Sequence, residues 1–522
     1  CSSDLPPTVT INQSSTQVDP TKNQPIHFTA IFSEPIFSDI FTDNPVLSVN
    51  GVTDTPTINI TEIAPNDGTT FDIAVSGLTQ SDTISVSLLE NKVIDLAGNY
   101  NLQSTSTDNS VEYDITNPTV TISTSASDPT NQSPIPISIE FSESVVGFEL
   151  SDIAVTNGTA SNFSGADDTY TAEIIPLDDG LVTAEIHSGI ANDTAGNINT
   201  ASSQFTIEYD STPPSVTVEQ SIDQADPTNL SPVHFTATFS EPINPNSFSS
   251  EDVLISGSAG ASSVTITPLT PASFDIAIAT IPKNGTIQVG IPNETVKDTA
   301  GNFNTASTSK DNIVTYDADE LMVSIEKSET QPDPTNTTPM SFTVVFNKPI
   351  NLETFTFDDF LLVGPEGTKL TGINELEPYD DTTFEISLDG TTEDGAVALT
   401  MPEGKVQDLA GNTNTASTSS NNTVLYDITR PTSTISIDIT SPTNLSPIPI
   451  SIEFSELVIG FELSDIAVKN GSPSNFSGTG DSYSVDVTPV EEGLITIELP
   501  ENIAVDLAGN PNIASAPIEL TF

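Results

Sequence analysis

The sequence is poor in cysteine, tryptophan and basic residues. It has one cysteine, Cys1, and no tryptophan in 522 residues. A single cysteine excludes an intrachain disulfide and therefore a small disulfide-stapled module. No stretch approaches the roughly 18 consecutive apolar residues of a transmembrane helix. Only 11 lysines and arginines stand against 73 acids, for a formal net charge of −62. Such a chain repels nucleic acid and anionic membrane surfaces, and it attracts cations.

Motifs of common catalytic centres are also missing from the sequence. It has no Gly-x-Ser-x-Gly elbow, no His-Glu-x-x-His pair and no phosphate loop. His27 and His234 occupy the same polar-facing strand position, and we interpret them as exposed residues without a role. The sequence therefore predicts a protein that is not an enzyme. A paired-carboxylate hydrolase stays open as a rival, because carboxylates abound.

What the sequence does contain is a long internal repeat. Two motifs recur five times in alternation, which indicates whole domains of about 100 residues rather than short solenoid units. The first motif, Asp-Pro-Thr-Asn or a close variant, begins at Asp19, Asp128, Asp226, Asp333 and Ser441. The second motif, Asp-x-Ala-Gly-Asn, begins at Asp95, Asp193, Asp298, Asp408 and Asp506.

Apolar residues alternate with polar ones after each first motif. Ile26, Phe28, Ala30 and Phe32 fall on one side of a strand, and the other repeats follow the same pattern. No segment has convincing helical periodicity. About seven short strands per repeat predict an all-β fold of five tandem immunoglobulin-like β-sandwiches. The expected domains are residues 1–115, 116–211, 212–318, 319–428 and 429–522.

The linkers between the repeats are short and mostly contain proline. Proline restricts its own backbone and that of the preceding residue, and no Gly/Ser-rich spacer is present. We therefore expect an extended, semi-rigid rod. The linker after Tyr316 is the only one of the four without proline, so the junction between repeats three and four should be the most flexible.

These motifs together resemble tandem bacterial Ig-like domains of large surface proteins and adhesins. A third motif, Phe-Ser-Glu, supports the resemblance and includes Glu34, Glu143, Glu241 and Glu456. The resemblance covers essentially the whole chain. It implies extension, spacing, surface display and often bound calcium. Repeat four departs from the pattern, because Lys348 replaces the glutamate.

Acidic residues of three kinds should meet at one pole of each sandwich. The loop after the second strand, the loop before the last strand and the arriving linker share that pole in this fold. Carboxylates gathered there would repel one another without a cation, and Ca²⁺ prefers such oxygen ligands. The expected groups are Asp114, Glu143 and Asp193; Asp210, Glu241 and Asp298; Asp427, Glu456 and Asp506; and Asp4, Glu34 and Asp95.

A simpler interpretation of the second motif stays open beside the cation site. Gly98 would supply a positive φ, while Asp95 and Asn99 would cap backbone groups of a turn. In repeat four, Lys348 could neutralise Asp317 or Asp408 in place of a metal, or Asp319 and Glu320 could restore the site. We favour the first. The first motif falls in the loop at the opposite pole, where it could form a turn or contribute to a metal site. We favour the turn, because Ser441 replaces the aspartate in repeat five and an obligatory ligand would not be replaced.

The sequence begins like a mature bacterial lipoprotein, in which the first cysteine carries a lipid. A lipid on Cys1 would then be the only link to a membrane, and an arbitrary chain boundary is the alternative. We expect a non-catalytic, surface-displayed stalk or adhesin segment, extracellular and rigidified by calcium. Its partners would be an unknown surface receptor or neighbouring subunits. The rivals are a self-assembling filament or surface-layer subunit, and a carbohydrate-binding or hydrolytic exoprotein.

Overall fold

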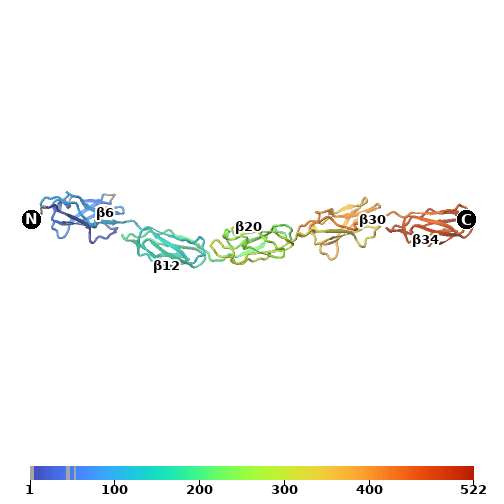
Figure 1. Cartoon of the computed structure of the whole chain (residues 1–522), viewed down its shortest axis with the longest axis horizontal. Coiled ribbons are helices and arrows are strands. Elements are labelled where there is room, and N and C mark those ends of the chain that lie inside the picture. Colours follow the sequence, from blue (N-terminus) through green and yellow to red (C-terminus); the bar gives the residue numbers. More distant parts are fainter. Residues whose placement is uncertain (1–4, 43–46, 52–54) are drawn as a thin grey trace. The chain divides into compact units, whose positions relative to one another are not determined.

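The chain consists almost entirely of short antiparallel strands. The computed structural model describes residues 5–42, 47–51 and 55–522, so Cys1 and Asp4 lie outside the described residues. The chain divides into two compact units. The first contains residues 1–216, 239–252 and 292–307, and the second contains residues 217–238, 253–291 and 308–522. Figure 1 labels one strand in each of the five repeats.

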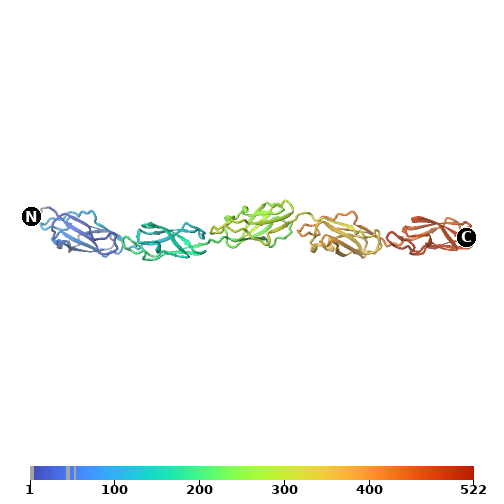
Figure 2. The same ribbon diagram turned by 90° about the horizontal axis from the view of Figure 1, so that it is seen from below.

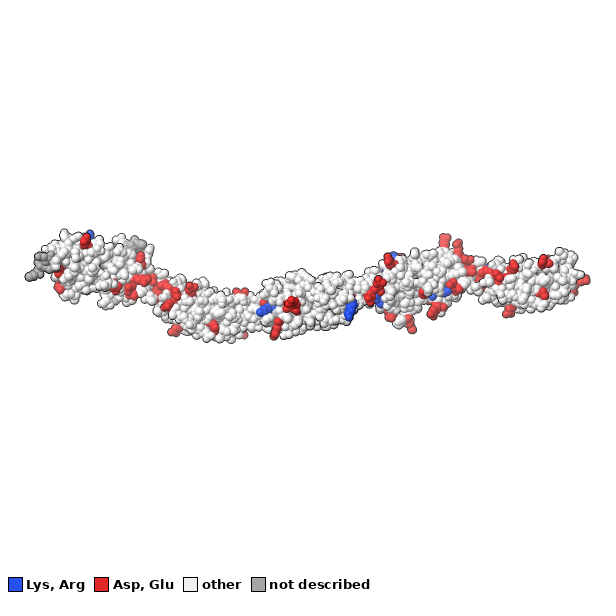
Figure 3. Space-filling model, viewed as in Figure 1, with Lys and Arg blue, Asp and Glu red and all other residues white. Residues whose placement is uncertain are grey.

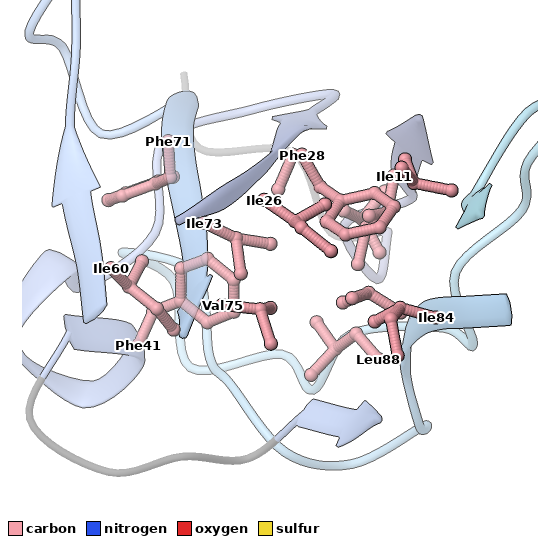
Figure 4. Close-up of a cluster of buried hydrophobic side chains, with 14 of the residues drawn as sticks. Ile11, Ile26, Phe28, Phe41, Ile60, Phe71, Ile73, Val75, Ile84 and Leu88 are labelled. Carbon is pink, nitrogen blue, oxygen red and sulfur yellow. The ribbon is translucent and has the colours of Figure 1, made fainter. Parts of the chain in front are cut away.

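The first repeat pairs a four-stranded sheet with a three-stranded one. The sheet order is β1-β2-β5-β4 opposite β3-β6-β7. The strands are β1 (Val9–Gln13), β2 (Ile26–Phe32), β3 (Leu47–Asn50), β4 (Thr57–Glu62), β5 (Thr70–Ser76), β6 (Asp82–Leu88) and β7 (Ser110–Tyr113), with one short helix, α1 (Ser38–Thr42). The alternating apolar residues of both sheets point inward and form the core shown in Figure 4.

The second repeat has the same two layers and a longer hairpin. Its main sheets have the orders β12-β13-β9-β8 and β11-β14-β16, and β10 pairs with β15. The strands are β8 (Val120–Ser123), β9 (Ile135–Phe141), β10 (Val145–Val146), β11 (Ile153–Thr156), β12 (Gly158–Ala166), β13 (Thr169–Pro176), β14 (Gly180–Ile186), β15 (Asn192–Asp193) and β16 (Phe205–Tyr209). The 3-10 helix η1 (Leu150–Asp152) precedes β11.

The third and fourth repeats follow the plan of the first. In repeat three, β17 (Val216–Gln220), β18 (Val233–Phe239), β21 (Ser273–Ala279) and β20 (Ser263–Thr270) face β19 (Leu254–Ser256), β22 (Gly285–Gly290) and β23 (Ile313–Tyr316). In repeat four, β24 (Val323–Lys327), β25 (Met340–Phe346), β28 (Thr383–Asp389) and β27 (Lys369–Glu375) face β26 (Leu361–Val363), β29 (Gly395–Thr400) and β30 (Thr423–Tyr426).

The fifth repeat resembles the second in detail. Its strands are β31 (Ser433–Ser436), β32 (Ile448–Ile459), β33 (Ala467–Lys469), β34 (Gly471–Pro489), β35 (Leu494–Glu498), β36 (Val505–Asp506) and β37 (Ile518–Thr521). Both repeats stack a phenylalanine on a tyrosine, Phe163 on Tyr170 and Phe476 on Tyr483. Short 3-10 helices in repeats three to five are η2 (Pro245–Ser247), η3 (Ser250–Asp252), η4 (Leu352–Thr354), η5 (Phe357–Asp359) and η6 (Leu463–Asp465).

The prediction of all-β, Ig-like sandwiches is therefore confirmed. Figure 2 shows the two layers of strands within the repeats from a second direction. The longest α-helix in the described part of the chain has five residues. None of the described helices combines the length and apolarity needed to cross a membrane. Acidic side chains far outnumber basic ones on the face shown in Figure 3, as the composition requires.

The first motif forms a turn that fastens the last strand of its repeat. We name these turns the exit turns; they are residues 19–22, 128–131, 226–229, 333–336 and 441–444. The Asp128 carboxylate accepts the Glu208 N–H at 3.0 Å, and Thr130 bridges Tyr209 in a parallel sense. In repeat five the Ser441 hydroxyl accepts the Thr521 N–H at 3.0 Å instead. The predicted turn is thus confirmed, and serine fulfils the role of aspartate.

The beginning and the end of a repeat also meet in parallel. Thr10 bridges Thr105, Thr217 bridges Thr308 and Ser324 bridges Thr418, each in a parallel sense. Together with the exit-turn bridges, these contacts hold the first strand region against the closing segment. Each closing strand lies at the edge of a sheet, so these bridges add hydrogen bonds where a strand would otherwise have pairing on one side only.

Candidate functional site

Three carboxylates come together at the predicted pole of repeats two, three and five. In each group, one oxygen per residue lies within 4.8 Å of the others, and the aspartate of the second motif is buried. We name them the acidic triads: Asp114, Glu143 and Asp193; Asp210, Glu241 and Asp298; and Asp427, Glu456 and Asp506. The predicted grouping of these nine residues is confirmed, while the metal that would occupy them stays a prediction.

The glutamate of each triad is positioned by the serine before it. The Ser142 N–H donates to the Thr119 carbonyl at 2.9 Å, and the Thr119 N–H donates to the Ser142 hydroxyl at 3.0 Å. This pair of bonds ties the start of the Phe-Ser-Glu loop to the first strand of the repeat. The same exchange joins Ser455 to Thr432 in repeat five. The glutamate that follows therefore faces the arriving linker.

The buried aspartate of each triad belongs to a tight turn. We name these turns the entry loops; they are residues 95–99, 193–197, 298–302, 408–412 and 506–510. Asp193 pairs with Val145, two residues after Glu143, which places the two acids side by side. Its Oδ1 atom accepts the Asn197 N–H at 2.8 Å, and Gly196 has a φ of +91°. The predicted turn with a glycine at positive φ is therefore confirmed as well.

The linker aspartate is held by the repeats on both sides of it. The Asp114 N–H donates to the Thr21 carbonyl of repeat one at 2.9 Å. Its carbonyl accepts the side-chain amide of Asn197 in repeat two at 2.8 Å. Asp210 and Asp427 repeat both contacts with their own neighbours. A ligand that binds the linker carboxylate would thus bind at the junction of two repeats.

The triads are electrostatically unfavourable as bare carboxylates. Burial, and next the charges of Asp114 and Asp193, raise the pKa of Glu143 to about 7. Burial, followed by the charges of Asp210 and Asp298, raises the pKa of Glu241 to about 7 as well. Burial and the neighbouring acids Asp506 and Asp427 also raise the pKa of Glu456. Each triad therefore favours uptake of a positive charge, either a proton or a metal cation.

In repeat four a lysine ammonium occupies the corresponding place. Lys348 Nζ lies 2.7 Å from Asp408 Oδ2 and 3.0 Å from Asp317 Oδ2, and it also donates to the Asp319 carbonyl at 2.6 Å. Burial opposes the charge, but hydrogen bonds to Asp408 and then Asp317 raise the pKa of Lys348. The prediction that this lysine pairs with the linker and entry-loop acids is confirmed.

Repeat one presents part of the same arrangement. Asp95 is buried, and its Oδ1 atom accepts the N–H groups of Ala97 and Asn99 at 2.8 Å each. Glu34 is half-buried and follows a serine that exchanges hydrogen bonds with Thr8. The third predicted ligand, Asp4, lies outside the described residues, so the predicted group of Asp4, Glu34 and Asp95 stays a prediction.

A second asparagine, two residues after each entry loop, was not singled out by the sequence analysis. Asn199 is buried; its Oδ1 atom accepts the N–H groups of Ile190 and Ala191, and its Nδ2 atom donates to two carbonyls. This residue fixes the shape of the loop that carries Asp193. The signal was present in the sequence, since Asn101, Asn199, Asn304, Asn414 and Asn512 extend the second motif in all five repeats.

The interpretation of two histidines was wrong. His27 Nδ1 lies 2.9 Å from Asp72 Oδ2, and His234 Nδ1 lies 3.0 Å from Asp275 Oδ1. Both histidines are half-buried and pair across neighbouring strands rather than pointing freely into solvent. Cross-strand pairs of this kind contribute to sheet stability. They lie on strands rather than in the loops that form the acidic triads.

The exit turn of one repeat also contacts the entry loop of the next. The Asn131 N–H donates to the Ala300 carbonyl at 3.1 Å, and its side-chain amide donates to Asn302 at 3.1 Å. Asn229 and Asn336 make the same two bonds to the following repeats. Lys22 reaches the Gly196 carbonyl in the corresponding place. The final residue of the first motif is therefore a contact between repeats, which the sequence analysis did not anticipate.

The bacterial Ig-like domain family matches the chain in two segments, residues 114–209 and 427–521. Repeats two and five are bacterial Ig-like domains. The other three Ig-like repeats have the same pairing of a four-stranded and a three-stranded sheet and the same two motifs. Both matched segments begin at a linker aspartate, so the family pattern includes the residue that we place at the junction.

Several solved bacterial structures are similar to this chain. An Escherichia coli adhesin, FdeC, is 15% identical over 59% of this chain and 96% of its own, with a TM-score of 0.30. Invasin, described as a bacterial integrin-binding protein, is 12% identical over 99% of this chain and 100% of its own, with a TM-score of 0.32. InvD of Yersinia pseudotuberculosis is 12% identical over 59% and 96%, with a TM-score of 0.27. Curated protein sequences contain no match.

Proposed function

We propose that this chain is a non-catalytic stalk or adhesin segment, displayed outside a bacterial cell, whose repeat junctions are locked by Ca²⁺. Tandem Ig-like repeats joined by short linkers, three of the four with proline, support the stalk. Its partners would be a surface receptor or neighbouring subunits.

One observation carries the calcium part of the proposal. Lys348 places an ammonium group between Asp317 and Asp408, where three other repeats have a third carboxylate. Equivalent junctions thus occur in two forms. The junction before repeat four contains a lysine ammonium, and those before repeats two, three and five contain three carboxylates that would need a bound cation. The lysine in repeat four supports the idea that a positive charge at this position stabilises the junction.

The spacing of the triads suits calcium. Ca²⁺ binds oxygen at 2.3–2.6 Å, so a central ion reaches oxygens that are up to about 5 Å apart. The triad oxygens meet this limit, since all lie within 4.8 Å of one another. Mg²⁺ binds at about 2.0–2.1 Å and demands a closer octahedron. Each site would complete its six to eight ligands with water or carbonyl oxygens.

Bound calcium would stiffen a junction through the linker aspartate. Asp114 is bonded to repeat one by its N–H group and to repeat two by its carbonyl. A cation held by Asp114, Glu143 and Asp193 would add a third attachment to repeat two and remove the repulsion among the acids. Binding to the folded chain alone stabilises it by mass action.

The test introduces a lysine into one triad, removes the lysine of repeat four, and measures the number of calcium ions bound. Equilibrium dialysis of the full chain against ⁴⁵Ca²⁺ should give at least three tight sites, one for each triad. Glu143→Lys should remove one site and Lys348→Glu should add one. Lys92→Glu changes the net charge equally at a residue outside the triads, and should leave the number of sites unchanged. Equal binding by all four proteins would refute calcium at the triads.

Self-assembly into a filament is the second candidate. The contacts between an exit turn and the following entry loop favour it, because they join repeats head to tail. A carbohydrate-binding or hydrolytic role is the third, and the absence of tryptophan platforms argues against it.

A further inference from the structure

The three-stranded sheet of repeat four has an apolar outer face. Alternate residues of β26, β29 and β30 point away from the core, and the strand pairing sets Val363, Ala398 and Thr423 in one row. We name the whole surface the apolar face; its residues are Leu361, Val363, Ala396, Ala398, Thr400, Thr423 and Leu425. Five of these seven residues are apolar and none is ionisable. Leu361, Val363 and Leu425 are 55%, 60% and 46% exposed, so the face lies open to solvent.

The equivalent faces of the other repeats are polar or charged. In repeats one, two, three and five, the strand pairing puts at the position of Leu425 the residues Glu112, Glu208, Thr315 and Thr521. Lys469 takes the place of Val363 in repeat five, and Glu185 takes that of Thr400 in repeat two. A solvated sheet face is ordinarily polar, so the fold does not require apolar residues at these positions. Repeat four alone has them together.

The apolar face is also fixed in shape. β29 pairs with β26 on one side and with β30 on the other. The exit turn holds β30 from its second side, because the Leu425 N–H donates to the Asp333 carboxylate and the Leu425 carbonyl accepts the Thr335 N–H, both at 2.9 Å. Exposed acids, Glu366 and Glu393, follow β26 and precede β29. A contiguous apolar surface with a polar rim marks an interaction site.

We propose that the apolar face binds the apolar face of a second copy of this chain. With a net charge of −62, two copies repel each other wherever acids meet, so a contact between copies belongs where ionisable side chains are missing. A different protein would instead be recognised through basic groups that complement the acids of this chain. An apolar surface is also complementary to itself, as a two-fold contact requires, because the same residues then meet from both sides.

The size of the face predicts a weak pair. Three strands about 4.8 Å apart, with about five residues of about 3.3 Å each, give a sheet face of roughly 250 Å². A stable interface of standard size buries about 800 Å² on each partner. The apolar face alone therefore does not sustain a permanent dimer in dilute solution. It would join copies that are already crowded together, such as chains displayed side by side.

Sedimentation velocity of the full chain tests the proposal. Every protein carries Cys1→Ser, so that no disulfide joins the copies, and is measured in physiological salt and chelator up to millimolar concentration. Leu425→Glu places an acid on the face, at a position where Glu112 and Glu208 show that the fold accepts one. Thr315→Glu is the matched control, since it makes the same change of net charge at the equivalent position of repeat three. The parent and Thr315→Glu should associate, and Leu425→Glu should do so about tenfold more weakly or less.

Cross-linking locates the contact without changing the charge. Sheets packed face to face lie about 10 Å apart, a separation that a short bis-maleimide spans. In the Cys1→Ser chain, Ala398→Cys should join two copies several-fold faster than Gln288→Cys, the equivalent position of repeat three. Ala398 is half-buried and Gln288 is exposed, so accessibility alone would favour the opposite order.

Three results would overturn the proposal. The first is equal association of Leu425→Glu and Thr315→Glu, and the second is equal rates of linking through Ala398→Cys and Gln288→Cys. The third is the absence of any association at millimolar concentration, which is also the result expected if the face serves a different protein. Because all measurements are made in chelator, none of these results depends on calcium at the acidic triads.

Discussion

At the scale of single residues, the junctions between repeats depend on buried carboxylates and on the charged groups beside them. The two versions of the acidic site illustrate this. In repeat four, burial would raise the pKa of Asp408, but hydrogen bonds from Lys348 and Asn412 lower it. In repeat two no cationic side chain reaches the acids among the described residues, and the pKa of Glu143 rises instead. The protonation of the triads should therefore be visible in the stability of the protein.

We expect the stability of the calcium-free chain to fall as the pH rises from 5 to 7.5. The pKa of Glu143 and of Glu241 is about 7 in the folded chain, against an ordinary value of 4.5. The folded state thus binds these protons more tightly than the unfolded state. The resulting stabilisation is complete below pH 4.5 and is lost as the pH passes 7. Calorimetry in chelator across this range should show the decline.

The control for this prediction is the double variant Glu143→Gln with Glu241→Gln, which should flatten the pH dependence. Calcium and protons compete for the same oxygens, so added calcium should stabilise the native chain mainly near and above pH 7. Acids with a lowered pKa, such as Asp179, change their contribution only below their ordinary pKa of 3.8. A melting temperature that rises between pH 5 and 7.5 in chelator would contradict the prediction.

The buried asparagine after the entry loop should be a large single contributor to stability. Asn199→Ala removes four hydrogen bonds and leaves two N–H groups and two carbonyls without that partner. We expect a loss of about 3 kcal/mol in the free energy of unfolding of repeat two. Asn192→Ala, at an exposed position nearby, should change it by less than about 0.5 kcal/mol. Denaturant unfolding measures both, and equal losses would contradict the assigned role.

At the scale of strands and turns, the exit turn acts as a clamp on the closing strand. Asp128 accepts an N–H of that strand, and Ser441 does the same in repeat five. We therefore expect Asp128→Ser to keep most of the stability and Asp128→Ala to lose about 1 kcal/mol, because only the serine restores an acceptor. Thermal melts of the two variants provide the comparison. If serine is as destabilising as alanine, the acceptor is not the reason for the motif.

The strands could be predicted because a local sequence pattern determines them. The triads could be predicted because the order of those strands determines which loops meet. Alternation at Ile26, Phe28 and Ala30 gives a strand with one buried face, whatever the neighbouring repeats do. The sandwich topology then brings Glu143 and Asp193 to one pole, since the loops at each pole are fixed by strand order. The grouping of the acidic triads in repeats two, three and five follows from that reasoning.

The remaining features could not be predicted because they depend on contacts that no periodic pattern in the sequence indicates. The bond from Asn131 to the next repeat requires the orientation of two domains, which no alternation of residues encodes. The pairing of His27 with Asp72 requires the register of two strands that are 45 residues apart in sequence. Asn199 lies two residues beyond Asn197, outside the second motif as we defined it. In that case the recurrence in five repeats was sufficient, and only the boundary of the motif was wrong.

At the scale of the whole molecule, the proposed stalk has a testable dimension. Scaling for a globular protein of this length gives a radius of gyration of about 24 Å. Five sandwiches held apart by short linkers should give a value well above that in small-angle X-ray scattering of the calcium-loaded chain. A radius near the globular value would contradict the stalk, whatever the metal content.

Chelation should loosen the junctions unequally. The junction before repeat four has its own ammonium, whereas those before repeats two, three and five have acidic triads. In chelator we expect the distribution of interatomic distances obtained from small-angle scattering to broaden. The double variant Glu143→Lys with Glu241→Lys should suppress much of that change. The prediction that the linker without proline is the most flexible stays a prediction. Scattering that is the same with calcium and with chelator would exclude a locking role.

The parallel bridges within repeats one to four have a mechanical consequence. Thr10 with Thr105 and Thr21 with Tyr113 join the start of repeat one to its end, running in the same direction. When such a repeat is pulled by its two termini, the paired segments must slide past each other, so tension loads these bonds together in shear. Antiparallel neighbours pulled at adjacent ends would instead peel apart one bond at a time. A chain that tethers a cell against flow would be loaded in its more resistant direction.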